Sequence, residues 1–226
     1  MNQQVEPAAN SPSARSVTVI GLALALVSPS VIGVVLNLLP GGTRFPVAIA
    51  TEWVLVIIVL AIITLGERQK LTSIGFRKTS AADLMLGFAG FVIGVLTFGV
   101  TAPLMKALGL SSTTEGIGHL LKVSISWRIA FALTAGITEE ILFRGYAIER
   151  LYSLTGRLVL SAAVSFVAFS SINLLFMGIG GGIQIAVWSV LITGLYVWRR
   201  NLPACMVMHT LNNLAAFVIL PLLPMK

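Results

Sequence analysis

Long apolar stretches, separated by short polar or charged turns, follow one another from Val17 to the end of the chain. A helix that crosses a bilayer needs about 20 predominantly apolar residues. Stretches of about this length predict spans at 17–39, 46–65, 81–103, 128–150, 158–177, 183–198 and 203–223. The pattern therefore predicts an all-α fold, a polytopic integral membrane helix bundle of about seven to eight transmembrane helices.

The composition agrees with a lipid environment. The chain is 57% hydrophobic and only 10% charged, whereas a soluble domain is about 25% charged. Residues 1–16 are polar and contain two prolines, so we expect a disordered N-terminal tail. We expect residues 17–226 to form a single membrane domain, with a motif-bearing core at about 125–216.

The basic residues give the bundle an orientation. Net charge is +7, but these residues punctuate the apolar stretches instead of sharing one polar face, which argues against a nucleic-acid partner. With the N-terminus in the cytoplasm, the cytoplasmic segments carry Arg15, Arg68, Lys70, Arg77, Lys78, Arg144, Arg150, Arg157, Arg199 and Arg200, and the outer ones carry Arg44, Lys106, Lys122, Arg128 and Lys226. This two-to-one bias predicts a multi-pass protein with a cytoplasmic N-terminus. We expect a prokaryotic plasma membrane.

Two adjacent acids, Glu139 and Glu140, lie inside the predicted span 128–150. A carboxylate at the centre of a transmembrane helix costs about 2.5–3.5 kcal/mol on insertion scales, so such residues usually mark an ion path, a proton path or catalysis. Glu140 and Arg144 are spaced i, i+4 with the acid first, which favours an ion pair on one helix face. Glu139 lies about 100° around the helix and does not share that pair.

Helix geometry predicts which other polar residues meet these acids. Glu139 lies 17 residues before Gly156, and Asn173 lies 17 residues after it, so in an antiparallel hairpin the two side chains share one height. His209 lies eight residues beyond the turn at Asn201. The helix rise places both Glu139 and His209 about 12–15 Å deep in the cytoplasmic half of the bundle. These residues are therefore predicted to form one polar pocket, and Asn213 shares the face of His209.

These residues also carry a resemblance. The run Glu139-Glu140-x-x-x-Arg144 resembles the first motif of the CAAX prenyl protease and bacteriocin-processing family, also called the Abi family, of intramembrane proteases. His209-Thr-Leu-Asn-Asn213 resembles the third motif, HxxxN. The resemblance covers about residues 125–216, with the motifs in the expected order.

One motif departs from the family pattern. The second motif is FxxxH, but here Phe169-Ser-Ser-Ile-Asn173 carries asparagine in place of histidine. The chain has two histidines, His119 and His209, and we expect His119 to be exposed in a loop. Asparagine cannot accept and return a proton near neutral pH, and it is a poorer zinc ligand than imidazole. Activity is therefore expected to be impaired.

The resemblance implies an intramembrane endopeptidase that hydrolyses a peptide bond near the cytoplasmic membrane face. Glu139 would activate a water molecule, and Glu140 would orient the site with Arg144. His209 and Asn213 would bind a metal or stabilise the oxyanion. The implied cofactor is either a divalent metal such as zinc, held by Glu139 and His209 as in a metalloprotease, or none. The implied partners are the lipid bilayer and a peptide or protein substrate, prenylated in some members.

Several alternatives stay open. The chain is either an active protease or a catalytically inactive relative that acts as a membrane binding, immunity or regulatory protein. Asn173 favours the inactive relative. A third interpretation is that Asn173 is an engineered change in an otherwise active enzyme. A proton-coupled carrier is disfavoured because the acids cluster at one level. The sequence motifs of the other intramembrane proteases are absent. A mechanism with paired aspartates is excluded, because Asp83 is the only aspartate. A single cysteine, Cys205, excludes an internal disulfide and a cysteine metal cluster.

Overall fold

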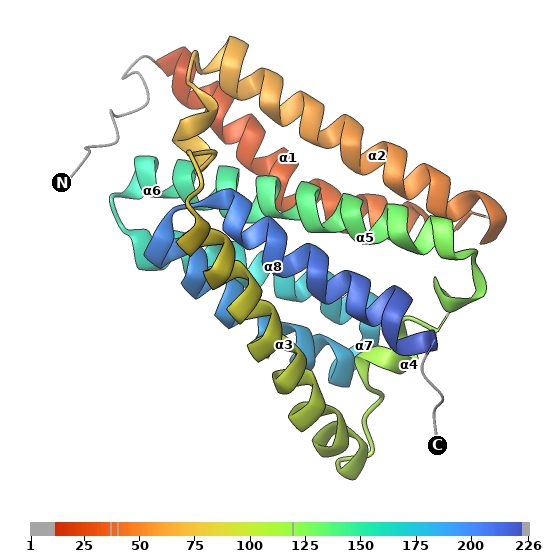
Figure 1. Ribbon diagram of the computed structural model, residues 1–226. Coiled ribbons are helices and arrows are strands. Elements are labelled where there is room, and N and C mark those ends of the chain that lie inside the picture. The colour runs from red at the N-terminus through yellow and green to blue at the C-terminus, as the bar shows by residue number, and fades with distance from the viewer. Residues whose placement is uncertain (1–11, 37, 40, 119, 223–226) are drawn as a thin grey trace.

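The computed structural model describes residues 12–36, 38–39, 41–118 and 120–222. These residues form helices and no strand (Figure 1). The α-helices are α1 (Pro12–Leu36), α2 (Gly41–Ala61), α3 (Ala81–Ala107), α4 (Thr113–Gly116), α5 (Ile125–Glu139), α6 (Glu149–Thr155), α7 (Leu158–Arg199) and α8 (Leu202–Leu214). Short π- and 3-10-helical segments are η1 (Ile62–Gly66), η2 (Leu71–Ile74), η3 (Leu120–Lys122), η4 (Glu140–Ile148), η5 (Ala215–Ile219) and η6 (Leu220–Leu222).

The predicted all-helical fold is confirmed. Five helical stretches are long and apolar enough to cross a membrane, at Arg15–Leu36, Thr43–Gly66, Ala81–Ala107, Leu158–Arg199 and Leu202–Leu222. The predicted count of seven to eight spans is not confirmed. Of the tail expected to be disordered, residues 1–11 lie outside the described residues, and residues 12–16 form the start of α1. His119 also lies outside the described residues.

Helix α7 is interrupted at Gly178, which adopts φ 70° and ψ −179°. This backbone conformation favours glycine because a side chain would clash there. Beyond the interruption the helix turns back, since the rings of Phe169 and Trp188 lie 6.5 Å apart, whereas 19 residues of straight helix would separate them by about 28 Å. The two halves of α7 therefore pack side by side, and the interruption at Gly178 falls between the ranges 158–177 and 183–198 that the sequence analysis separates.

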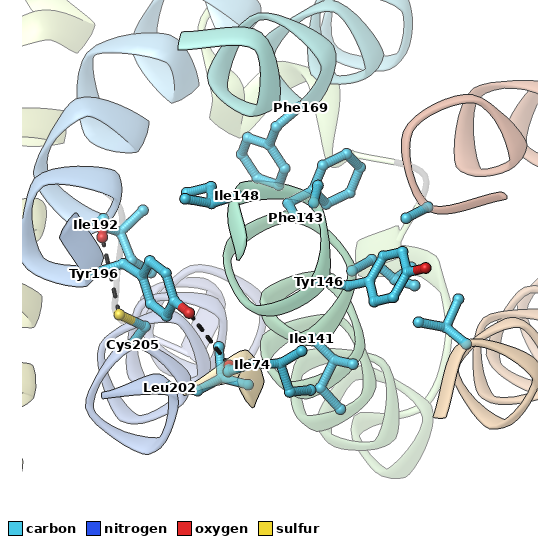
Figure 2. Packing of buried hydrophobic residues seen from close by; sticks show 14 of the residues in the cluster. Ile74, Ile141, Phe143, Tyr146, Ile148, Phe169, Ile192, Tyr196, Leu202 and Cys205 are labelled. Carbon is cyan, nitrogen blue, oxygen red and sulfur yellow. Dashed lines mark hydrogen bonds between the residues drawn. The ribbon is translucent and has the colours of Figure 1, made fainter. Parts of the chain in front are cut away.

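Helix α5 continues without a break into the π-helical η4 and then into α6, which ends at Gly156 with φ 67°. All nine residues of η4 are buried. Figure 2 shows side chains of η4 pointing in several directions into their neighbours: Phe143 meets Phe169 of α7, and Tyr146 points toward α1, where its hydroxyl lies against Gly21. The centre of the hydrophobic core is thus the segment that begins at Glu140.

Close approach of α8 to α5 positions the polar pocket. A Cβ atom added at Gly136 would lie 2.8 Å from Cα of Thr210 and 2.3 Å from its hydroxyl oxygen. Such short separations mean that the two backbones touch at a point one turn before Glu140 and one residue after His209. Glycine at this position is therefore what allows the acids of α5 and η4 to reach the histidine of α8.

Buried ion pairs hold the end of the bundle where α6 lies (Figure 1). Arg150 donates to Glu67 at 2.7 Å, and the hydroxyl of Tyr146 donates to the same carboxylate at 2.8 Å. Arg200 pairs with Glu149, whose carboxylate also accepts from Tyr196 at 2.7 Å. These contacts tie η1, α6 and α7 together and leave their acids no part in the central pocket.

Candidate active site

Glu140 is the fully buried centre of the polar pocket. Its Oε1 accepts a hydrogen bond from Arg144 Nη1 at 2.8 Å and lies 2.7 Å from His209 Nδ1. Arg144 in turn donates to the hydroxyl of Ser189 at 2.8 Å and stacks 4.2 Å above the ring of Phe169. A buried carboxylate that accepts from two fixed donors is positioned rigidly. Glu140 and Arg144 therefore orient the histidine ring and are not available to a substrate.

Glu139 differs from its neighbour in exposure. Its side chain is 29% exposed, against 0% for Glu140. It contributes to the wall of a cavity, and its Oε2 lies 3.7 Å from Nε2 of His209. The imidazole thus lies between two carboxylates, with Nδ1 turned to the sealed one and Nε2 turned to the accessible one. Of the two acids, Glu139 is the one that a water molecule or a substrate can reach.

The cavity has a volume of about 500 Å³ and is bounded mainly by apolar side chains. Helices α1, α2, α5, α7 and α8 all contribute to it. Its aromatic residues are Phe45, Phe98, Phe131, Phe143, Phe169, Phe176, Trp188 and Phe217; its polar ones are Arg44, Glu52, Thr113, Thr138, Glu139, Asn173, Asn212 and Asn213. A cavity of this size with few polar groups suits a ligand that is mostly apolar and is oriented at one point.

Three asparagines line the cavity and differ in their contacts. Asn173 lines the cavity, and its Nδ2 donates to the carbonyl of Phe169 at 3.0 Å within the same helix. Asn212 is buried and donates to the carbonyl of Met208 at 2.9 Å. Asn213 lines the cavity and makes no side-chain hydrogen bond among the described residues. The structure therefore brings Glu139, Asn173 and Asn213 to one cavity wall, with His209 directly behind Glu139.

The comparison with protein families bears on this segment. Residues 121–215 match the family model described as type II CAAX prenyl endopeptidase Rce1-like. Residues 121–215 are Rce1-like. The resemblance to the CAAX prenyl protease family is thereby confirmed. No curated protein and no solved structure matches the chain.

The Rce1-like segment begins just before α5 and ends at the start of η5. It contains both acids, Arg144, Asn173 and the HxxxN motif, and it leaves out α1, α2 and α3. The family is a protease family of the CAAX type, and its membrane character agrees with the apolar helices. The cavity, however, is completed by side chains of α1 and α2, which lie outside the matched segment.

The sequence did not single out several residues of the site. Trp188 contacts His209 in an edge-to-face arrangement with ring centroids 4.9 Å apart, and the hydroxyl of Ser189 accepts a hydrogen bond from Arg144. Neither residue type stands out in an apolar span, so no signal distinguished them. Glu52 is different, because it is an isolated acid within the predicted span 46–65. An ionisable residue in a span is a functional candidate by itself, and that signal pointed to it.

The donor set of the Rce1-like segment does not fit zinc. Catalytic zinc usually has three protein ligands, and the described residues contain no group of three histidine, cysteine or acidic side chains placed to hold a metal. Of the two proposed ligands, His209 commits Nδ1 to Glu140, and its Nε2 is 3.7 Å from Glu139. The proposed reaction therefore assigns no role to a metal.

Proposed function

We propose that the chain is an intramembrane endopeptidase of the CAAX type, in which Glu139 activates the attacking water. One observation carries the proposal: of the two adjacent acids, Glu139 alone reaches the cavity, while Glu140 is sealed behind it by Arg144 and His209. A general base must lie within reach of the water whose proton it takes. The membership of residues 121–215 in a protease family supports the same reaction.

The neighbouring groups supply charge stabilisation. Hydrolysis of an amide passes through a tetrahedral intermediate that carries an oxyanion, which needs fixed hydrogen-bond donors. The Nδ2 group of Asn213 is one donor on the cavity wall. His209 lies behind Glu139, with Nδ1 2.7 Å from Glu140 and Nε2 3.7 Å from Glu139, so its proposed role is to hold the carboxylate that activates the water. Glu140 and Arg144 act through this ring as positioning residues.

The cavity suggests the class of substrate. A volume of about 500 Å³ with an aromatic wall suits a lipid chain or a run of apolar side chains next to the scissile bond. We therefore propose a peptide or protein with an apolar or prenylated residue beside the bond that is cut. Purified protein should cleave a prenylated peptide with a lower KM than the same peptide without the lipid; equal KM values would exclude a lipid-binding role for the cavity.

The variant Glu139→Gln tests the assignment of the base. It keeps the shape of the side chain but cannot take a proton, so kcat should fall about 10²–10⁴-fold, with the folded fraction unchanged. Turnover is measured on purified protein in detergent or nanodiscs with a fluorogenic peptide. The control Thr51→Val alters an exposed hydroxyl of α2 that bonds its own helix and should retain full turnover. Glu139→Gln with wild-type turnover would remove Glu139 from the reaction.

Asn173 supports a second candidate function, a family relative that binds a membrane peptide without cutting it. The amide at this position cannot relay a proton, and its Nδ2 bonds the carbonyl of Phe169 in its own helix. Such a relative would bind apolar peptides in the same cavity but show no turnover. Gain of turnover in Asn173→His, with none in the wild type, would establish this second function and exclude the first.

A further inference from the structure

Glu52 is a third carboxyl group in the cavity. It comes from α2, outside the Rce1-like residues 121–215. It lines the same cavity as Glu139, and its Oε2 lies 2.7 Å from the hydroxyl of Thr138, the residue directly before Glu139. The motif residues alone therefore do not account for the acid groups around the reaction site.

The hydrogen bonds around Glu52 are compatible with a proton on its carboxyl group. The hydroxyl oxygen of Thr138 lies 2.7 Å from Glu52 Oε2 and 2.8 Å from the carbonyl oxygen of Thr134. The single proton of this hydroxyl can serve only one of the two oxygens at a time. When it serves the carbonyl of Thr134, a common arrangement for threonine in a helix, the contact with Glu52 is satisfied by a proton on the carboxyl group.

The surroundings of Glu52 favour the same state. Among the described residues no ion pair involves Glu52, whereas Glu67, Asp83, Glu140 and Glu149 each pair with an arginine. A carboxylate without a cation in an apolar membrane cavity is costly, and a second carboxylate nearby adds repulsion. One neutral and one ionised carboxyl group is the arrangement that avoids both costs, as in other paired-carboxylate sites.

We propose that Glu52 is the general acid of the peptidase, the group that protonates the leaving amine. This inference rests on the proposed function. Glu139 takes a proton from water while the water oxygen bonds to the carbonyl carbon. Glu52 then gives its proton to the amide nitrogen as the C–N bond breaks, which yields a carboxylic acid and an amine. Water in the cavity returns the proton from Glu139 to Glu52, so that one water molecule is consumed and both groups are reset.

This role explains how the site tolerates Asn173. Amide cleavage needs a proton donor for its poor leaving group, and the second-motif position, where the family pattern has histidine, cannot supply one here. Glu52 lines the same cavity from a different helix. A carboxylic acid from α2 would therefore replace an imidazole from α7.

The test compares two leaving groups on the same acyl chain. An amide needs a proton donor to depart, and an activated phenyl ester does not. Glu52→Gln should therefore lower kcat for the amide about 10²–10⁴-fold but change kcat for the ester less than about threefold. Glu139→Gln should lower both, since both need activated water. Thr51→Val, the matched control in α2, should change neither.

Two further variants guard against a purely structural effect. Thr138→Val keeps Glu52 but removes its hydrogen-bond partner, so it should lower amide turnover less than Glu52→Gln while sparing the ester. Asn173→His in the Glu52→Gln background should restore amide turnover, because it places a new proton donor on the same cavity wall. Rescue of this kind would not follow from a change in packing.

The outcomes separate the two proposals. A wild type that cuts neither amide nor ester overturns the proposed function and the acid role with it. A wild type that cuts both, with Glu52→Gln reducing amide and ester turnover equally or reducing neither, overturns the acid role alone. Loss of amide turnover with retained ester turnover supports both.

Discussion

Glu139 and Glu140 are neighbours in sequence but occupy different environments. The 100° that separates successive residues on a helix turns one toward the cavity and the other into the core. Glu140 accepts from Arg144 and His209 through Oε1, while its buried Oε2 has no hydrogen-bond partner in the part of the chain described. The same residue type is therefore accessible from the cavity at one position and sealed within an ion pair at the next.

This difference predicts opposite effects on stability. Glu140→Gln leaves Arg144 buried without its counterion, which costs about 3–5 kcal/mol when one partner of a buried pair is lost. Glu139→Gln breaks no ion pair with arginine and should cost well under half of that. Urea unfolding of both variants, followed by tryptophan fluorescence, checks the contrast. The double variant Glu140→Gln/Arg144→Met should be more stable than Glu140→Gln alone, and equal stability of all variants would contradict a buried charge pair.

At the scale of elements, the site depends on how closely α5 and α8 pack. Gly136 is the position where the two backbones meet, with Thr210 on the other side. The acids follow on α5 and η4, and the histidine precedes Thr210 on α8. Any increase in the distance between the helices would separate Glu140 from His209, since their hydrogen bond spans the same gap.

Gly136→Ala should therefore damage both fold and activity. The new methyl group would lie 2.3 Å from the hydroxyl oxygen of Thr210, and overpacking of this kind costs about 1–3 kcal/mol. Unfolding can be followed with a thiol-reactive dye, because Cys205 is the only cysteine and is fully buried. The matched control is Gly99→Ala in α3, where an added Cβ meets nothing within 4 Å. A lower unfolding temperature for Gly99→Ala than for Gly136→Ala would contradict this packing.

At the scale of the whole molecule, the cavity has a direction. Its wall runs from Glu139 to Leu36 at the end of α1 and Arg44 near the start of α2. These helix ends lie at the end of the bundle opposite α6 (Figure 1). The basic segments that the charge bias assigns to the cytoplasm lie at the α6 end. With a cytoplasmic N-terminus, this end of the cavity wall would therefore face away from the cytoplasm.

We expect the orientation that the charge bias predicts, in which the far end of the cavity faces away from the cytoplasm. Single cysteines at exposed, uncharged positions test this: Leu38→Cys at the cavity end and Thr72→Cys at the α6 end. A membrane-impermeant maleimide added to intact cells should label Leu38→Cys and spare Thr72→Cys. The reverse pattern would place the cavity toward the cytoplasm and contradict the orientation. The natural Cys205 is fully buried and gives no background signal.

The residues of the Rce1-like motifs could be found without coordinates. Glu139, Glu140, Arg144, His209 and Asn213 stand out because charged and polar groups are rare in apolar spans. The equal heights of Glu139 and Asn173 about Gly156 also follow from the helix rise alone. The partners Ser189 and Trp188 could not be found in this way, because a serine or tryptophan in a membrane helix carries no such signal.

The sequence by itself determined the class of the molecule. A bilayer offers no water to unpaired backbone groups, so long apolar stretches must become helices, and rare polar residues in them mark the place of chemistry. Only the tertiary structure decided which acid reaches the cavity and which is sealed. It also brought Glu52 of α2 to Thr138 of α5, 86 residues away. Such contacts depend on how separate helices pack, and no periodicity within one helix encodes them.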